Sequence, residues 1–202
     1  SPTNNFCTLN PLEQRGTVAL SEGNLKTVMS SDGAAVSSTF GLESGKWYFE
    51  VLRVTADGNT SVGFRKDEYS IDTLNNNLGY AAGSIGAYAG TELKVFGATG
   101  QTITAVGADE IRTIAVDVDN GKLYVGAEGT WDNSGDPAAG SGYYSDALPA
   151  GLIPTLGDSA TQAETLTANF GQDSSFAGAK TAQGNADGNG YGDFYYAPPS
   201  GY

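Results

Sequence analysis

Histidine is absent from this chain of 202 residues, and cysteine occurs once, as Cys7. Without histidine, neither a Ser-His-Asp triad nor a Cys-His pair can form. A single cysteine permits no disulfide within the chain and no zinc site built on several thiolates. These absences exclude the common triad hydrolases, disulfide-stabilised folds and cysteine-rich zinc modules.

Basic residues are scarce, since 10 Lys and Arg stand against 23 Asp and Glu and leave a formal net charge of −13 at pH 7. Such a surface repels phosphate backbones and anionic lipid headgroups, so we expect neither nucleic acid nor membrane insertion. No apolar run reaches the length of a membrane-spanning helix, and no charged segment precedes an apolar leader. The chain begins at Ser1 rather than Met, so we expect either processing or a place within a longer protein.

No segment shows a convincing helical pattern, and 29 glycines with only 16% charged residues indicate many loops. The 11 Tyr and 8 Phe favour sheets, because aromatic side chains fit a pleated, half-buried surface. Turn signals recur about every 8–12 residues, which is typical of a β-sandwich. The predicted strands are residues 17–20, 24–29, 36–40, 46–54, 60–65, 79–82, 86–89, 93–96, 111–119, 122–127, 152–156 and 164–170.

This pattern predicts an all-β fold, an antiparallel β-sandwich with essentially no helix. Residues 1–35 are expected to supply N-terminal strands that complete the sandwich, residues 36–176 its core, and residues 177–202 a Gly- and Asn-rich extension. The side chains expected between the two sheets are Trp47, Phe49, Ile114, Val116, Val118, Leu123, Val125 and Phe170.

The clearest local signal is a hairpin over residues 111–127. Asn120-Gly121 is the favoured pair for a two-residue type I′ turn, because both positions require positive φ. That turn gives one face of the hairpin an apolar surface and points Asp117 away from the core, toward solvent or a neighbouring chain. The expected opposite pairs are Asp119 with Lys122, Val118 with Leu123, Val116 with Val125, and Ile114 with Ala127.

Alternation in the strand of residues 46–54 places Trp47, Phe49 and Val51 on one face. Arg53 then falls on the same apolar face, which simple alternation does not explain. The sequence leaves two interpretations open, a β-bulge near Arg53 or a strand that is buried on both sides.

Several motifs occur in the order typical of a known family of domains. Residues 45–51 (GKWYFEV), 62–64 (VGF) and 168–172 (ANFGQ) form its frame. Together they resemble the SPRY domain, the core of B30.2 modules and a concanavalin-like jelly roll. The resemblance implies a domain that binds, generally through its loops, and does not catalyse. Leu156 stands where peptide-binding members often carry an aromatic residue, which argues against recognition of a peptide degron.

Three further segments resemble a narrower group, the SPRY-containing structural proteins of tailed bacteriophages, especially marine ones. They are residues 7–12 (CTLNPL), 129–140 (GTWDNSGDPAAG) and 195–202 (YYAPPSGY). This resemblance implies a virion surface component, either a capsid decoration or part of a tail appendage, that contacts other virion proteins or itself. It also implies a virion or extracellular location.

Two competing functions stay open on the same architecture. One is an extracellular carbohydrate-binding, lectin-like module that recognises a host-surface glycan or protein. The other is a sandwich glycosidase, which needs only two carboxylates. The nearest pair is Asp117 with Asp119, and because the hairpin points Asp117 to solvent, we expect solvated acids and no enzyme.

Residues 66–78, 129–150 and 173–193 lack a strand pattern, and long loops in a compact domain are usually functional or disordered. Exposed aromatic residues in such loops favour interfaces. For Trp131 the alternative is that it folds back as a cap on the sandwich edge. The sequence predicts a contact surface that consists of Tyr69, Asn76, Trp131, Tyr143 and Tyr144.

Residues 187–193 (DGNGYGD) superficially resemble a calcium loop, with Asp187, Asn189 and Asp193 at positions 1, 3 and 7. Pro198 replaces the acid required at position 12, and Gly, Asn and Asp also form ordinary turns. We therefore expect a turn and no cofactor, with calcium at these three residues as the alternative.

Overall fold

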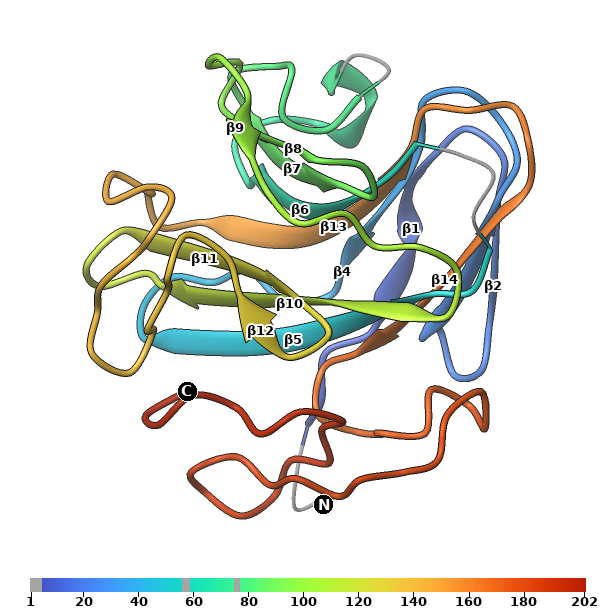
Figure 1. Ribbon diagram of the computed structural model, residues 1–202. Helices are drawn as coiled ribbons and strands as arrows, with labels where there is room; N and C mark the ends of the chain where they lie inside the picture. Colours follow the sequence, from blue (N-terminus) through green and yellow to red (C-terminus); the bar gives the residue numbers. More distant parts are fainter. Residues whose placement is uncertain (1–4, 56–58, 75–76) are drawn as a thin grey trace.

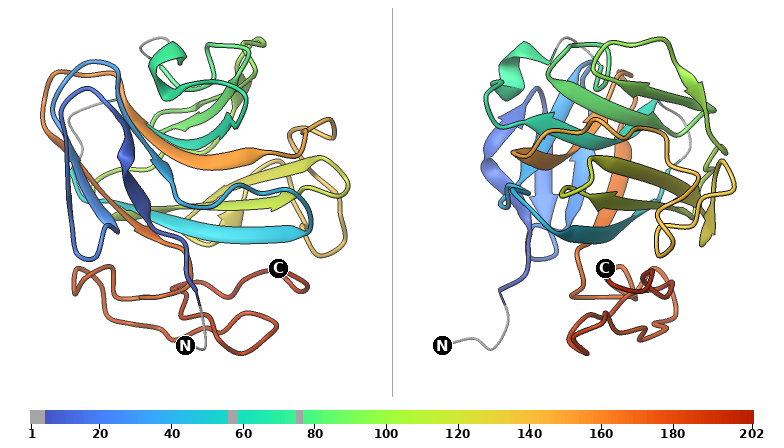
Figure 2. Two further views of the ribbon diagram at one scale, coloured as in Figure 1. Left: turned by 180° about the vertical axis from the view of Figure 1, so that it is seen from behind. Right: turned by 90° about the vertical axis from the view of Figure 1, so that its left-hand side faces the viewer.

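The structure is a computed structural model that describes residues 5–55, 59–74 and 77–202. Two antiparallel sheets are stacked face to face, and the C-terminal segment lies against the far side of one of them (Figure 1 and Figure 2). Apart from one turn of 3-10 helix, η1 (Ile71–Thr73), the regular elements are strands. The predicted antiparallel β-sandwich is confirmed.

The first sheet has 7 strands in the order β1-β4-β13-β6-β7-β8-β9. Its strands are β1 (Leu9–Arg15), β4 (Ala34–Ser38), β6 (Thr60–Lys66), β7 (Ser84–Tyr88), β8 (Glu92–Val95), β9 (Gln101–Thr102) and β13 (Leu152–Asp158).

The second sheet also has 7 strands, in the order β12-β11-β10-β5-β14-β3-β2. Its strands are β2 (Val18–Ser21), β3 (Lys26–Met29), β5 (Lys46–Arg53), β10 (Glu110–Asp117), β11 (Lys122–Ala127), β12 (Thr130–Trp131) and β14 (Glu164–Asn169). Because β1 joins the first sheet and the following β2 joins the second, the N-terminal strands connect the two sheets along one edge.

The main core lies between the sheets and contains most of the side chains expected there. Those in the core are Phe49, Ile114, Val116, Val118, Leu123 and Val125. Phe170 is half-buried and packs against this core. The expectation for Trp47 is wrong, because its side chain is 38% exposed. Trp47 lies near the start of β5, where β14 no longer flanks that strand.

The predicted hairpin register is wrong by two residues. Asp117 pairs with Lys122 and Val116 with Leu123, so a four-residue turn joins β10 to β11. The Asp117 carboxylate accepts hydrogen bonds from the backbone N–H and side-chain amide of Asn120, at 3.1 and 2.8 Å, which favours the wider turn. Of the turn pair, only Gly121 has positive φ, at 64°. A shift of two residues keeps every side chain on its face, so the apolar face of the hairpin is still correct.

The question at Arg53 is resolved in favour of a strand that is buried on both sides. β5 pairs with β10 residue by residue from Lys46 to Arg53, without a bulge. The Arg53 guanidinium points inward, donates to the carbonyl of Val106 at 3.0 Å and lies 3.8 Å from the Glu164 carboxylate. The charge is therefore accommodated inside the sandwich because it has partners there.

Three strands were not predicted, and one predicted strand is absent. β1, β9 and β12 contain few apolar residues, and β1 is irregular between Leu9 and Gln14. Residues 79–82 form a turn instead of a strand, because Gly79 has a φ of 83° and a Cβ there would lie 2.7 Å from Lys94 and 2.8 Å from the backbone of Gly86. These elements depend on contacts between distant segments rather than on local alternation.

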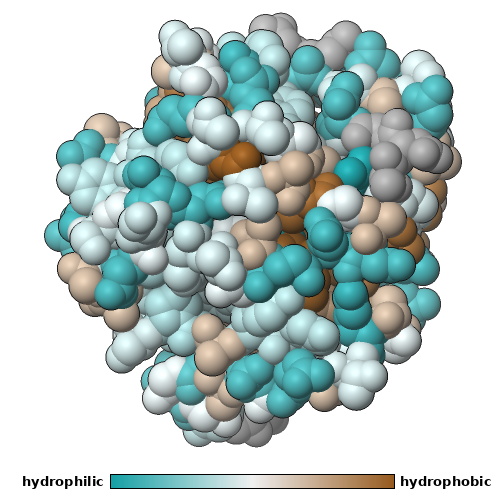
Figure 3. All heavy atoms as spheres, viewed as in Figure 1, coloured by the Kyte–Doolittle hydropathy of each residue, from teal (hydrophilic) through white to brown (hydrophobic). Residues whose placement is uncertain are grey.

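The outer face of the second sheet is covered. Tyr48, Leu52 and Tyr124 point outward from β5 and β11, yet each is at most 8% exposed. Phe176 and Phe194 of the C-terminal segment pack onto them. The second sheet therefore has apolar layers on both faces. On the side of the molecule seen in Figure 3, apolar residues are exposed only in small areas among polar ones.

Candidate binding site

Trp131 lies in β12 at the edge of the second sheet and is half-buried. Its ring meets the rings of Tyr48 and Tyr124 edge to face, with centroids 6.1 and 6.5 Å apart. Such arrangements are favourable for aromatic pairs. Trp131 is thus partly a cap on the sandwich, as the alternative interpretation expected, and part of its ring still faces solvent.

Tyr143 and Tyr144 point in opposite directions. The Tyr143 ring packs edge to face on Tyr124, with centroids 6.5 Å apart, and Lys122 Nζ lies 5.0 Å from the Tyr143 ring centre. Tyr144 packs against the main core, and its hydroxyl donates to the Thr102 carbonyl at 2.8 Å. Burial raises the pKa of Tyr144 to about 12. The structure therefore brings Trp131 and Tyr143 together around Tyr124 and directs Tyr144 elsewhere.

Tyr69, another predicted contact residue, lies in a different part of the molecule. Tyr69 follows β6 of the first sheet, is half-buried and lies flat against Gly83. Lys66 Nζ lies 5.8 Å from the centre of its ring. Asn76 lies outside the described residues.

The segment considered for calcium is a turn held by Asp187. Asp187 Oδ1 accepts from the backbone N–H groups of Asn189, Tyr191 and Gly192, at 3.1, 3.0 and 3.4 Å. Partial burial alone would raise the pKa of this carboxyl, but these N–H groups lower it below its ordinary value. Among the described residues, no group of three or more His, Cys, Asp or Glu side chains is placed to hold a metal ion, so Asp187 and Asp193 are not part of such a group.

Asp117, the acid considered for glycoside hydrolysis, is not solvated as expected. It is 4% exposed, and Lys46 Nζ lies 3.8 Å from its carboxylate. Asn120 folds back onto it, which explains the burial. Its neighbour Asp119 accepts from the backbone N–H of Gly45 at 2.8 Å. Both carboxylates therefore stabilise the β5–β10 end of the sheet.

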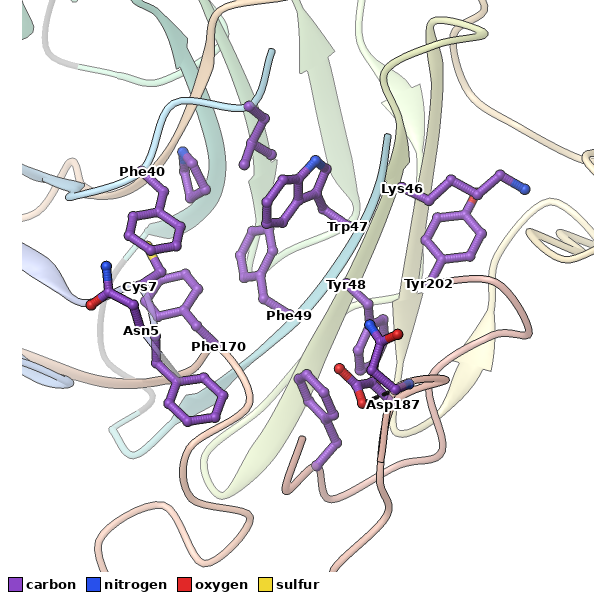
Figure 4. A pocket seen from close by; sticks show the side chains of 15 residues that line it. Asn5, Cys7, Phe40, Lys46, Trp47, Tyr48, Phe49, Phe170, Asp187 and Tyr202 are labelled. Atoms are coloured by element: carbon purple, nitrogen blue, oxygen red, sulfur yellow. Dashed lines mark hydrogen bonds between the residues drawn. The ribbon is translucent and has the colours of Figure 1, made fainter. Parts of the chain in front are cut away.

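The structure also contains a groove, about 340 Å³ in volume, that the sequence did not predict (Figure 4). It lies at the start of β5, and we call it the β5 groove. Aromatic side chains from distant parts of the chain form most of its walls; they are Phe6, Phe40, Trp47, Tyr48, Phe49, Phe170, Phe194 and Tyr202. Only Trp47, Tyr48 and Phe49 share a strand, which is why sequence patterns could not reveal the groove.

The two walls of the β5 groove differ in character. Phe40, Trp47, Phe49 and Phe170 gather on one side, where the Phe49 and Phe170 ring centroids are 5.5 Å apart. On the other side lie Tyr48, Tyr202 and Asp187. Lys46 Nζ sits 5.1 Å from the centre of the Tyr202 ring and is paired with Asp117. The groove thus has an apolar wall and a mixed wall, on which the Asp187 carboxylate has no ion-pair partner among the described residues.

Glu50 fixes the segment that builds the mixed wall. Its carboxylate is fully buried and accepts from the Tyr48 hydroxyl at 2.8 Å and the Asn169 side-chain amide at 3.2 Å. It also accepts from the backbone N–H groups of Tyr195 and Tyr196, at 2.9 and 2.7 Å. Burial raises the pKa of Glu50, and the hydrogen bonds oppose that rise. One side chain on β5 therefore anchors the C-terminal segment to the sheet.

A second, smaller hollow of about 230 Å³ lies on the first sheet. Tyr80, which is 47% exposed, lines it together with Asn59, Asn77 and Glu92. The Tyr80 hydroxyl donates to Glu92 at 3.0 Å, and Lys94 Nζ lies 4.3 Å from the ring centre. The hollow combines an open aromatic face with amide and carboxylate groups.

No protein-family model matches this chain, and no curated protein matches its sequence. Solved structures do match. The SPRY domain of human HERC1 matches with a TM-score of 0.65 at 14% identity, over 79% of this chain and 96% of that one. The fold is that of a SPRY domain.

Two further solved structures match this chain. The PSpry domain of TRIM65 matches with a TM-score of 0.59 at 14% identity, over 81% of this chain and 89% of that one. Stonustoxin matches with a TM-score of 0.57 at 17% identity, over 81% of this chain but 27% of its own. At these identities the likeness concerns the fold alone. In the described part of the chain, no helix has the length and apolar character to span a membrane.

Proposed function

We propose that this SPRY-fold domain is a non-catalytic protein-binding module on the surface of a phage virion, as a capsid decoration or in a tail appendage. The observation that carries the proposal is that the C-terminal segment lies beside two others. Residues 195–202 contact residues 129–140 and share the β5 groove with the start of residues 7–12, and these three segments carry the resemblance to phage structural proteins. Gly129 lies directly against the Tyr196 ring, and both Cys7 and Tyr202 line the β5 groove.

The contact surface in this proposal is the loop of residues 129–150. Trp131 and Tyr143 are half-buried there, and aromatic residues with a packed base and an open edge are frequent in protein interfaces. The net charge of −13 favours neighbours with basic surfaces. The module would act outside a cell or on the virion, in contact with other virion proteins or with copies of itself.

The test is the double variant Trp131→Ala, Tyr143→Ala, examined by native mass spectrometry and negative-stain microscopy. We expect it to fold but to lose assembly with itself or with virion proteins. The matched control Tyr80→Ala removes an exposed tyrosine from the turn of residues 79–82 and should assemble normally. A double variant that melts at lower temperature but still assembles would show that these aromatics are structural, and the proposed interface would be wrong.

The non-catalytic part of the proposal is tested separately. Lys46 and Asn120 hold Asp117, so it is poorly placed to act as a catalytic acid. We expect no release of reducing sugar from polysaccharides by the full chain. Turnover that disappears in Asp117→Asn would overturn this part.

A second candidate is a lectin-like module that recognises a host-surface glycan. The hollow at Tyr80 favours it, because an open aromatic ring beside Asn59, Asn77 and Glu92 offers stacking and hydrogen-bonding groups to a polar ligand. A glycan array addresses it directly. Binding that is lost in Tyr80→Ala but kept in the Trp131→Ala, Tyr143→Ala variant would support the lectin function.

A further inference from the structure

The first four residues of β5 have a strand neighbour on one side only. On one side β10 pairs with β5 along its whole length, from Arg53 to Lys46. On the other side β14 pairs with β5 from Arg53 only as far as Glu50, which lies opposite Asn169. Among the described residues, no strand continues beyond Asn169 along β5.

The backbone groups of Lys46 and Tyr48 point toward that vacant side. Gly45 and Arg53 direct their carbonyls toward the β10 side, where they accept from Val118 and Asp109 at 2.9 and 2.7 Å. Val54 N–H donates at 2.9 Å to Thr165, on the β14 side. Because the direction alternates along a strand, residues 46, 48 and 50 face the β14 side. Glu50 is paired there, whereas Lys46 and Tyr48 have no strand partner among the described residues.

This open edge lies inside the β5 groove rather than on a flat surface. Side chains of an added strand would alternate between the two walls. One set would contact Phe40 and Trp47, and the other would face Tyr202 and Asp187 (Figure 4). A strand of four residues spans about 13 Å. The groove therefore offers main-chain hydrogen bonds together with side-chain pockets on both faces.

The charge of the groove selects between possible strands. Lys46 is neutralised by Asp117 at 3.8 Å. Asp187 is held by backbone N–H groups, which leave its negative charge in place. The chain as a whole carries a net charge of −13. An incoming strand with basic side chains is favoured over an acidic one.

We propose that the β5 groove binds an extended peptide segment of a partner protein by strand addition to β5. The bound segment pairs with residues 46–49 of β5, in line with β14, which pairs with the rest of that strand. Its large apolar side chains contact Phe40 and Trp47, and a Lys or Arg points toward Asp187. The proposal depends on the role of the domain as a binding module, but it uses a surface separate from the loop of residues 129–150. Strand addition is a general mode of peptide recognition, and here the unpaired edge and the aromatic wall define it.

The test measures fluorescence anisotropy of three labelled hexapeptides with the full chain. The first alternates lysine and phenylalanine, and the second alternates glutamate and phenylalanine. The third repeats the first with an N-methyl group on every backbone nitrogen, so that its side chains and charge remain but its hydrogen-bond donors are lost. We expect the first peptide to bind at least tenfold more tightly than either of the others.

Two variants locate the bound peptide. Trp47→Ala should weaken binding of the lysine peptide at least tenfold. Asp187→Asn keeps an acceptor oxygen for the turn and removes the charge, so it should weaken binding about threefold. Leu12→Ala is the control, because Leu12 is an exposed apolar side chain on β1 outside the groove, and this variant should bind as the parent does. If Trp47→Ala does not fold, the Asp187→Asn variant and the N-methylated peptide still decide the question.

Several results would overturn the proposal. Equal binding of the N-methylated peptide would exclude strand addition, and unchanged binding by Trp47→Ala or Asp187→Asn would exclude this groove. A native dimer that is lost in Trp47→Ala would identify a second copy as the occupant. Binding that occurs only after deletion of residues 1–4 would identify the chain's own N-terminus instead. If the peptide does not bind in the β5 groove but assembly still depends on Trp131 and Tyr143, only the groove proposal is wrong and the proposed function stands.

Discussion

Replacement of Glu50 by Ala is expected to release the C-terminal segment from the second sheet. Four donors converge on the Glu50 carboxylate: the Tyr48 hydroxyl, the Asn169 amide and the backbone N–H groups of Tyr195 and Tyr196. Glu50 is 0% exposed, so the space left by the side chain has no direct access to bulk water. Glu50→Ala therefore leaves four buried donors without their acceptor.

The expected loss of stability follows from these four groups. A buried donor without a partner costs about 1–3 kcal/mol. Two of the four, at Tyr195 and Tyr196, can reach water if the segment lifts off, which limits the loss. Removal of the charge also offsets part of it, because burial disfavours the ionised carboxylate and raises the pKa of Glu50. We expect Glu50→Ala to lower the free energy of unfolding by about 2–4 kcal/mol.

Urea unfolding at pH 7 measures the global loss, and amide hydrogen exchange measures the local one. A local destabilisation of 2 kcal/mol or more should speed exchange at Tyr195 and Tyr196 by about 30-fold or more. Glu50→Gln is the matched control, because it keeps the shape and one acceptor oxygen, and it should lose less than Glu50→Ala. If Glu50→Ala retains the stability of the parent and slow exchange at Tyr195 and Tyr196, the carboxylate is not the anchor of the segment.

Two further predictions concern the sandwich itself. Val116 is 0% exposed at the centre of the core, so Val116→Asp should abolish folding in far-UV circular dichroism, whereas Ser21→Asp on the exposed edge of β2 should fold normally. Burial raises the pKa of Asp158 to about 6, and the hydrogen bond from the N–H of Ala160 opposes part of that rise. Because the folded protein holds the proton more tightly, the contribution of Asp158 to stability is present below about pH 4 and is lost as the pH rises through 6. Asp158→Asn should therefore reduce the fall in unfolding free energy between pH 4 and 7 by about 1–2 kcal/mol, and an unchanged pH profile in urea titrations would contradict the assignment.

Local patterns predicted the centre of the sandwich well. Ile114, Val116, Leu123 and Val125 lie inward although the hairpin register is wrong by two residues, because the face of a strand depends only on parity. The Asn120-Gly121 pair correctly marked the turn. It did not determine the turn length, because the Asp117 carboxylate binds Asn120 and widens the loop.

Burial of charged groups could not be predicted, because their partners are distant in the chain. Arg112 is 1% exposed and donates to the carbonyl of Tyr88, on a strand of the opposite sheet, at 2.9 Å. Glu50 is buried because Tyr195 and Tyr196 cover it. No local pattern distinguishes such residues from ordinary surface charges, since their burial follows from how the sheets and the C-terminal segment stack.

The structure brings together only some of the residues predicted to form a contact surface, and their role in binding stays a prediction. Trp131 and Tyr143 do come together, since both pack on Tyr124. Tyr144 is directed to the core, and its opposite orientation to Tyr143 is what alternation in an extended segment predicts. Trp47 was expected to be buried because alternation gives the face of a strand but not the point at which its neighbouring strand ends.

The same C-terminal segment links stability and binding. Phe194 and Tyr202 form part of the wall of the β5 groove, and Glu50 anchors the adjacent Tyr195 although it does not line the groove. Glu50→Ala should therefore weaken binding of the lysine–phenylalanine peptide and also speed amide hydrogen exchange at Tyr195. Trp47→Ala removes part of the groove wall but leaves the Glu50 hydrogen bonds in place. It should weaken binding of the peptide while amide exchange at Tyr195 stays slow. If both variants change exchange and binding in the same proportion, the aromatic wall has no separate role, and the groove is only a consequence of how the segment packs.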